Sequence, residues 1–200
     1  MIEQNKLYEI KYWLNQDKAV VLNTYKKFFE IVPIGLFSEC TVAADIGCGA
    51  YGGIFNEVTF PVMYGVDPMW GEYVSNGLVP CDDVKMVTAN ASNKFEMSQI
   101  GDLDCVFSIN ALDHSGDFNK SIENIYDSLK EGGLFAMHVQ LKTEEQLDIG
   151  HMMAIDTDKI MNSGIRLMHR LFLNEYVRCP FGNQNQAGKC ISAIIGVWKK

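Results

Sequence analysis

Apolar residues recur at helical spacing over roughly the first thirty residues of the chain. They form two sets: Leu7, Ile10 and Leu14, and then Val21, Tyr25, Phe28 and Val32. Asn15 and Asp17 interrupt the pattern and indicate a new N-cap between two helices. Pro33 then ends the second helix. The sequence therefore predicts an N-terminal helical cap over residues 1–35.

From residue 41 onward, short apolar runs alternate with helical stretches. The runs cover 41–46, 62–66, 84–88, 103–109, 134–141, 166–173 and 191–198. The clearest helix between them is 119–130, whose apolar stripe stops at Gly132. Runs of this kind are typical of a largely parallel sheet that is covered on both faces. A loop rich in Gly and Asn at 179–188 favours a hairpin, which would make the last strand antiparallel.

This alternation predicts an α/β, doubly wound, mostly parallel sheet of seven strands over residues 41–200. Together with the helical cap it would form a single domain over residues 1–200. The formal net charge of -8 disfavours nucleic acid and anionic lipid as partners. No apolar run reaches the ~18–20 residues that span a bilayer. The N-terminus lacks the pattern of a signal peptide, so we expect a cytoplasmic protein.

The six cysteines are widely spaced and form no C-x-x-C pair, so no metal site is expected. The chemistry is concentrated instead where the first predicted strand ends, in Asp45–Gly53. Gly47, Gly49 and Gly52 satisfy the G-x-G-x-x-G motif. The motif uses glycine because a sharp turn and a close approach of the backbone to a ligand both require the absence of a Cβ. Asp67 follows Gly47 by twenty residues and would accept hydrogen bonds from ribose hydroxyls. This spacing fits NAD and S-adenosylmethionine alike, since both contain adenosine.

Asp45 separates the two cofactors. A carboxylate beside the loop opposes a pyrophosphate, whereas it suits a ligand with a cationic sulfur and an ammonium group. The exit of the fourth strand, Asn110-Ala111-Leu112-Asp113-His114, and the turn at 129–135 add to the pattern.

In these motifs the sequence resembles the class I S-adenosylmethionine-dependent methyltransferases, which have a Rossmann-like fold. The likeness covers residues 41–141 and includes the D-I-G-C-G loop, the acidic end of strand two, N-A-L-D-H and L-K-E-G-G-L-F. Residues 64–69 with Glu72-Tyr73, and the early Tyr12-Trp13 pair, look like bacterial methyltransferases of surface-polysaccharide or other small-molecule pathways. The resemblance implies S-adenosylmethionine as the cofactor.

The resemblance also implies roles for individual residues. The methionine part would be wrapped by Gly47, Cys48, Gly49, Tyr51, Gly52 and Gly53, and its ammonium would be held by Asp45. The ribose would be bound by Asp67, the adenine by Pro68, Met69, Asn90 and Ala91, and the cleft would be lined by Asn110 and Ala111. The sequence departs from the family at Tyr51, which replaces the usual third glycine, and at Asn90, which replaces an Asp.

Methyl transfer to a hydroxyl usually needs a general base, whereas an amine needs only to be neutral. The expected catalytic residues are Asp113, His114 and His151. His138 is either a further candidate or a core histidine. We expect a small-molecule or saccharide-type acceptor that is methylated on oxygen or nitrogen. The sequence leaves the oligomeric state undetermined.

Two alternatives remain open at this point. An NAD-dependent oxidoreductase would use the Y-x-x-x-K pair of Tyr126 and Lys130. A non-catalytic partner protein would bind the cofactor without turnover. This alternative stays open because the glycine loop indicates cofactor binding and does not by itself indicate catalysis.

Overall fold

The computed structural model describes residues 2–78, 82–147, 153–176 and 192–200. Two N-terminal helices, α1 (Ile2–Asn15) and α2 (Lys18–Ile31), precede the sheet. The Asp17 side chain caps α2 by accepting a hydrogen bond of 2.8 Å from the backbone N–H of Ala19. The predicted break between the two helices is therefore confirmed.

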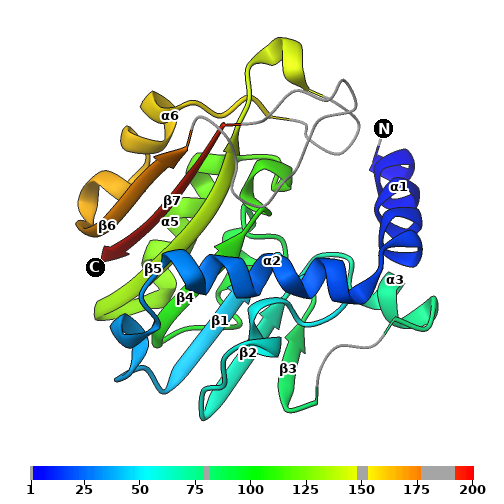
Figure 1. Ribbon diagram of the computed structural model, residues 1–200, viewed down its shortest axis with the longest axis horizontal. Helices are drawn as coiled ribbons and strands as arrows, with labels where there is room; N and C mark the ends of the chain where they lie inside the picture. The colour runs from blue at the N-terminus through cyan, green and yellow to red at the C-terminus, as the bar shows by residue number, and fades with distance from the viewer. Residues whose placement is uncertain (1, 79–81, 148–152, 177–191) are drawn as a thin grey trace.

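Seven strands form one sheet, in the order β3-β2-β1-β4-β5-β7-β6. Their bounds are β1 Val42–Ile46, β2 Val62–Val66, β3 Val84–Val87, β4 Leu103–Ile109, β5 Leu129–Leu141, β6 His169–Tyr176 and β7 Ser192–Lys199. β7 pairs antiparallel with both β5 and β6, and the other pairs are parallel. Figure 1 shows β7 running against its neighbours. The predicted Rossmann-like fold, with its antiparallel last strand, is confirmed.

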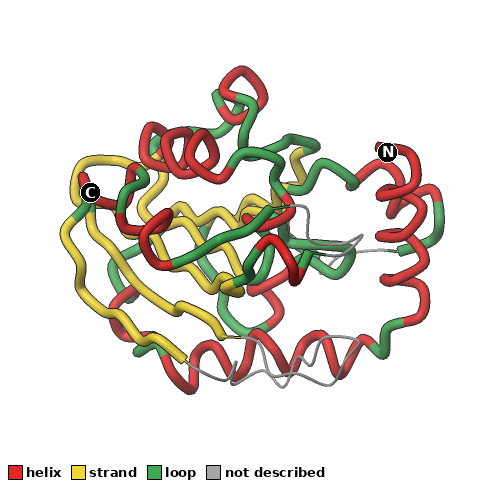
Figure 2. The backbone as a smooth tube through the Cα atoms, turned by 90° about the horizontal axis from the view of Figure 1, so that it is seen from above, coloured by secondary structure: helices red, strands yellow, loops and turns green. Residues whose placement is uncertain are grey.

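Helices cover both faces of the sheet (Figure 2). α5 (Phe118–Ser128) packs on one face through buried side chains that include Ile122 and Ile125. α2 packs on the other face, where Tyr25 and Phe28 join the second core cluster. The remaining helices are short: α3 Trp70–Ser75, α4 Lys94–Met97 and α6 Thr157–Met161.

Three details differ from the sequence-based expectation. The helix predicted at 119–130 ends at Ser128, because Leu129 already pairs with Leu103 in the sheet and the register shifts before the next pair. The run 166–173 is not all strand, since Gly164–Leu167 forms a 3-10 turn before β6. The alternation of strands and helical stretches implies a helix between β1 and β2. The glycine loop leads only into a single 3-10 turn, Gly53–Asn56, and α2 covers that part of the sheet.

The predicted packing face of α1, Leu7, Ile10 and Leu14, is wrong at two of its three residues. Leu7 and Leu14 are 57% and 51% exposed. The residues that pack are Ile10 and Trp13, which contact a small cluster beside the glycine loop. α1 therefore lies against the loop region and next to α3, and not on the main sheet (Figure 1).

Candidate functional site

The glycine loop sits at the carboxyl end of β1, between β2 and β4, where the strand order reverses and open α/β sheets bind ligands. Gly47 and Gly49 have left-handed φ values of 75° and 64°. A Cβ on Gly47 would lie 2.2 Å from the Cβ of Ala111, so the loop packs directly on the exit of β4. The glycine loop and the exit of β4, which the sequence predicts to line one cleft, thus lie in contact.

Asp45 lies at the base of this loop and is 1% exposed. Its Oδ2 accepts a hydrogen bond of 2.8 Å from the backbone N–H of Ile54. Its Oδ1 is buried and has no hydrogen-bond partner among the described residues. Burial raises the pKa of Asp45 to about 7, and the nearby Asp67 carboxylate contributes to the shift. A cationic ligand group would compensate this carboxylate.

Gly53 leaves the space that the Asp45 carboxylate fills. Its φ is 57°, and a Cβ there would lie 1.8 Å from Asp45 Oδ2. We expect Gly53→Ala to lower the free energy of unfolding by about 2–4 kcal/mol, through backbone strain and the displaced carboxylate together. The control is Gly77→Ala, at φ 78° with no described atom within 4 Å of the added Cβ. It should cost only the strain of about 1 kcal/mol. Urea denaturation of both variants measures the difference, and equal losses would contradict the steric explanation.

Asp67 lies at the end of β2 and is also buried. It accepts hydrogen bonds from the backbone N–H groups of Gly49 at 3.0 Å and Met69 at 2.8 Å. Burial raises the pKa of Asp67 to about 6, although these two hydrogen bonds lower it. Met69 is buried beside the loop, whereas Pro68 is exposed. Two buried carboxylates thus adjoin one glycine loop.

Residues at the exits of β3 and β4 complete this edge of the sheet. Asn90 Oδ1 accepts hydrogen bonds of 2.9 Å from both the backbone N–H and the hydroxyl of Ser92. Ala91 is buried. Asn110 has a left-handed φ of 56°, and its Oδ1 accepts a 2.7 Å hydrogen bond from Gln140 Nε2. The amide oxygen of Asn90 is therefore already engaged in a local turn.

α1 adds an aromatic residue that the motifs did not predict as part of the site. The Trp13 ring lies so close to Gly49 that a Cβ there would be 2.3 Å from Trp13 Cζ2. The same ring packs edge-on against Tyr51 and Tyr73, with centroids 5.6 and 6.1 Å away. Tyr51, which replaces the usual third glycine, thus helps to seat α1 on the loop.

The candidate acid–base residues meet just after β4. Asp113 is 1% exposed, and its Oδ1 lies 3.7 Å from His114 Nε2. The opposite nitrogen, His114 Nδ1, lies 3.8 Å from Oε1 of Glu9 on α1. Glu9 could not be predicted as part of the site, because nothing in its local sequence pattern links α1 to β4.

Two other histidines were considered from the sequence. His138 lies on β5 and is 1% exposed. Burial lowers its pKa to about 4, against the opposing effect of Asp113, so it is a neutral core side chain at pH 7. His151 lies outside the described residues.

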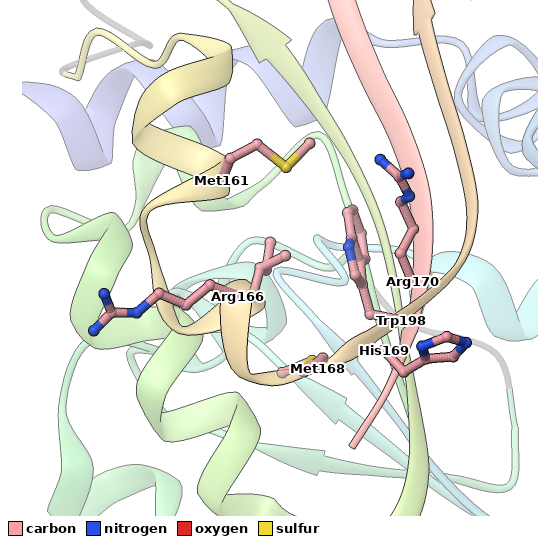
Figure 3. A pocket seen from close by; sticks show the side chains of 7 residues that line it. Met161, Arg166, Met168, His169, Arg170 and Trp198 are labelled. Carbon is pink, nitrogen blue, oxygen red and sulfur yellow. The ribbon is translucent and has the colours of Figure 1, made fainter.

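The described part of the chain also has a hollow of about 330 Å³ at the opposite edge of the sheet (Figure 3). It lies between the start of β6 and the end of β7, beside Trp198. The side chains of Arg166, His169 and Arg170 extend away from one another around it and form no common anion site. This hollow is remote from the glycine loop, so it is not the cofactor site.

Tyr126 and Lys130, the pair that an oxidoreductase would use, make structural contacts. Lys130 Nζ binds Asp104 Oδ1 at 2.9 Å. The Tyr126 ring lies 4.4 Å from Lys200 Nζ. Among the residues that the structure describes, no group of acidic, histidine or cysteine side chains could hold a metal ion. Within those same ranges no helix has the length and apolarity to cross a membrane.

The paired carboxylates suit S-adenosylmethionine, because the buried and unpaired Asp45 oxygen accepts a cation and would repel a pyrophosphate. Residues 44–137 match the family model of a methyltransferase domain. No curated protein matches the chain in sequence.

Solved structures share the fold at low sequence identity. A protein assigned as a sarcosine dimethylglycine methyltransferase from Galdieria sulphuraria is 14% identical over 98% of both chains, with a TM-score of 0.67. The N-methyltransferase NodS from Bradyrhizobium japonicum, in complex with S-adenosyl-l-homocysteine, is 12% identical over 98% of both chains, with a TM-score of 0.67. The [4+2]-cyclase SpnF is 13% identical over 89% of this chain and 80% of that chain, with a TM-score of 0.61. The family match identifies a methyltransferase domain over residues 44–137. The chain shares the fold of S-adenosylmethionine-dependent methyltransferases.

Proposed function

We propose that the protein methylates a small-molecule or saccharide-type acceptor on oxygen or nitrogen, in the cytoplasm. The observation that carries the proposal is the buried pair of carboxylates at the glycine loop, of which Asp45 has an oxygen without a hydrogen-bond partner in the described chain. Asp45 would bind the ammonium group of the cofactor, directly or through water, and Asp67 its ribose. Gly47, Cys48, Gly49 and Tyr51–Gly53 would contact the methionine part.

When bound, S-adenosylmethionine supplies a methyl group: the acceptor atom bonds to the methyl carbon while the carbon–sulfur bond breaks and its electron pair stays on sulfur. The protein orients the acceptor and takes up the proton that the acceptor loses. His114 would take this proton, and Asp113 beneath it would orient the ring. Pro68 and Met69 would contact the adenine, together with Asn90 and Ala91. Asn110 and Ala111 would line the cleft, and His151 remains a candidate for acceptor contact.

Several features support a small acceptor over a nucleic acid. The chain has a net charge of -8, and the described site presents carboxylates rather than basic groups. A structural neighbour is assigned to sarcosine and dimethylglycine, which are small molecules. The SpnF cyclase shares the fold, so the fold alone does not establish the reaction.

Isothermal titration calorimetry with S-adenosylhomocysteine and with NAD tests the cofactor half of the proposal, and only the first is expected to bind. Incubation with methyl-labelled S-adenosylmethionine tests the acceptor half. The panel should contain hydroxyl compounds, amines, saccharides and RNA. Transfer to one of the small compounds is expected. Transfer to RNA alone, or binding of NAD without binding of S-adenosylhomocysteine, would refute the proposal.

A further inference from the structure

We propose that Glu9 of α1 is a positioning residue for His114, so that the N-terminal helix contributes directly to the acceptor half of the site. This inference rests on the proposed function, in which His114 takes the acceptor proton. Glu9 and His114 are 105 positions apart in sequence, and their side chains meet only because α1 is seated on the glycine loop.

Three separate contacts fix α1 in this position. Trp13 packs on Gly49 and on the rings of Tyr51 and Tyr73. The Tyr51 hydroxyl donates to the backbone carbonyl of Trp13 at 3.4 Å. One turn before Glu9, Lys6 forms an ion pair with Glu72 of α3. Glu9 also hydrogen-bonds the Trp13 side chain, so the residue that seats the helix orients this carboxylate as well.

The His114 ring lies between two carboxylates. Glu9 Oε1 faces Nδ1 at 3.8 Å, and Asp113 Oδ1 faces Nε2 at 3.7 Å. The Glu9 and His114 side chains are 28% and 29% exposed, so their interaction is only partly screened by water. Asp67 interacts with both Glu9 and His114, and His138 interacts with Asp113. Two further titratable groups, Tyr12 and Tyr73, interact with Glu9.

This geometry gives Glu9 a function during proton transfer. When the acceptor proton moves to a ring nitrogen, the imidazole becomes a cation, and both neighbouring carboxylates stabilise that cation. Burial raises the pKa of Glu9, and the nearby His114 and the hydrogen bond with Trp13 oppose that rise. An imidazole with only Asp113 beside it would hold the transferred proton less well.

Nuclear magnetic resonance of the His114 ring tests the proposal without a known acceptor. The protein has four histidines, and His114→Gln assigns the signal. The ring signals are followed against pH in the free protein and with saturating S-adenosylhomocysteine. In Glu9→Gln, the pH at which the signal is half shifted should fall by about 0.5–1 unit in both states. In Glu9→Asp, which keeps the negative charge, this midpoint should fall by less.

Glu72→Gln is the matched control, because it also removes one acidic group and one α1 contact but does not touch His114. It should leave the His114 midpoint unchanged. An equal fall in Glu72→Gln would mean that seating of α1, and not the Glu9 charge, is responsible, and would overturn the proposal. So would an unchanged midpoint in Glu9→Gln, or an effect seen only without S-adenosylhomocysteine. Failure of that ligand to bind the wild-type protein in calorimetry would instead count against the proposed function.

Discussion

Replacing Asp45 with asparagine is expected to weaken the binding of S-adenosylhomocysteine about 100-fold at pH 8, or about 2.7 kcal/mol. Asn preserves the shape and the oxygen that accepts from Ile54 N–H, so the loop should keep its conformation. The substitution removes the negative charge of a side chain that is 1% exposed. Few water molecules can reach this position to solvate the ligand's ammonium group in place of the carboxylate. Removing one partner of such a buried pair leaves the ligand's ammonium group without its counter-charge.

Calorimetry measures this effect directly. Asp127→Asn serves as the charge-matched control, because Asp127 pairs with Lys94 at an exposed position on the surface. The control should bind S-adenosylhomocysteine with wild-type affinity. If Asp45→Asn also bound as tightly as the wild type, the Asp45 carboxylate would not be the group that holds the ligand.

The second large effect is on the stability of the free protein as a function of pH. The pKa of Asp45 is raised to about 7, from an ordinary value near ~3.9 in an unfolded chain. The folded protein therefore binds more protons than the unfolded chain between these values, and stability falls as the pH rises through this window. Each pKa unit corresponds to about 1.4 kcal/mol, so Asp45 alone should cost roughly 2–4 kcal/mol between pH 4 and pH 8. Asp67, with a pKa of about 6, acts in the same direction.

The difference between wild type and Asp45→Asn isolates this contribution. His138 has a lowered pKa, so its contribution to stability is lost as the pH falls and opposes that of the two aspartates. Both proteins contain His138, and its contribution cancels in the difference. Urea denaturation from pH 4 to pH 8 should give two proteins of similar stability at pH 4, with the variant more stable at pH 8. Parallel curves would show that Asp45 does not titrate in this range.

The fold could be predicted from the sequence because strands that are buried on both faces of a sheet consist of short apolar runs. β1, β2, β4 and β7 all lie within a residue of the runs that predicted them. The glycine loop could be predicted as well, since positive φ values and a close approach to Ala111 restrict Gly47 to glycine. These are local constraints, and local sequence carries them.

The acceptor half of the site could be predicted only in part. Asp113 and His114 follow a strand end, which is a local signal, but their contact with α1 depends on tertiary packing. Helical periodicity placed Leu7 and Leu14 on the packing face, whereas the loop is contacted by Trp13. A helix that packs on a polar loop need not bury its most apolar stripe, so periodicity misplaces its functional face.

The single 3-10 turn at Gly53–Asn56 has a consequence for ligand choice. In nucleotide-binding folds where a long helix follows the glycine loop, the partial positive charge at its N-terminus attracts phosphate groups. Residues 47–61 contain no such helix, so this dipole does not point at the ligand. A dinucleotide would meet two buried carboxylates with no compensating helix end, and the loop architecture itself thus selects against polyphosphate ligands.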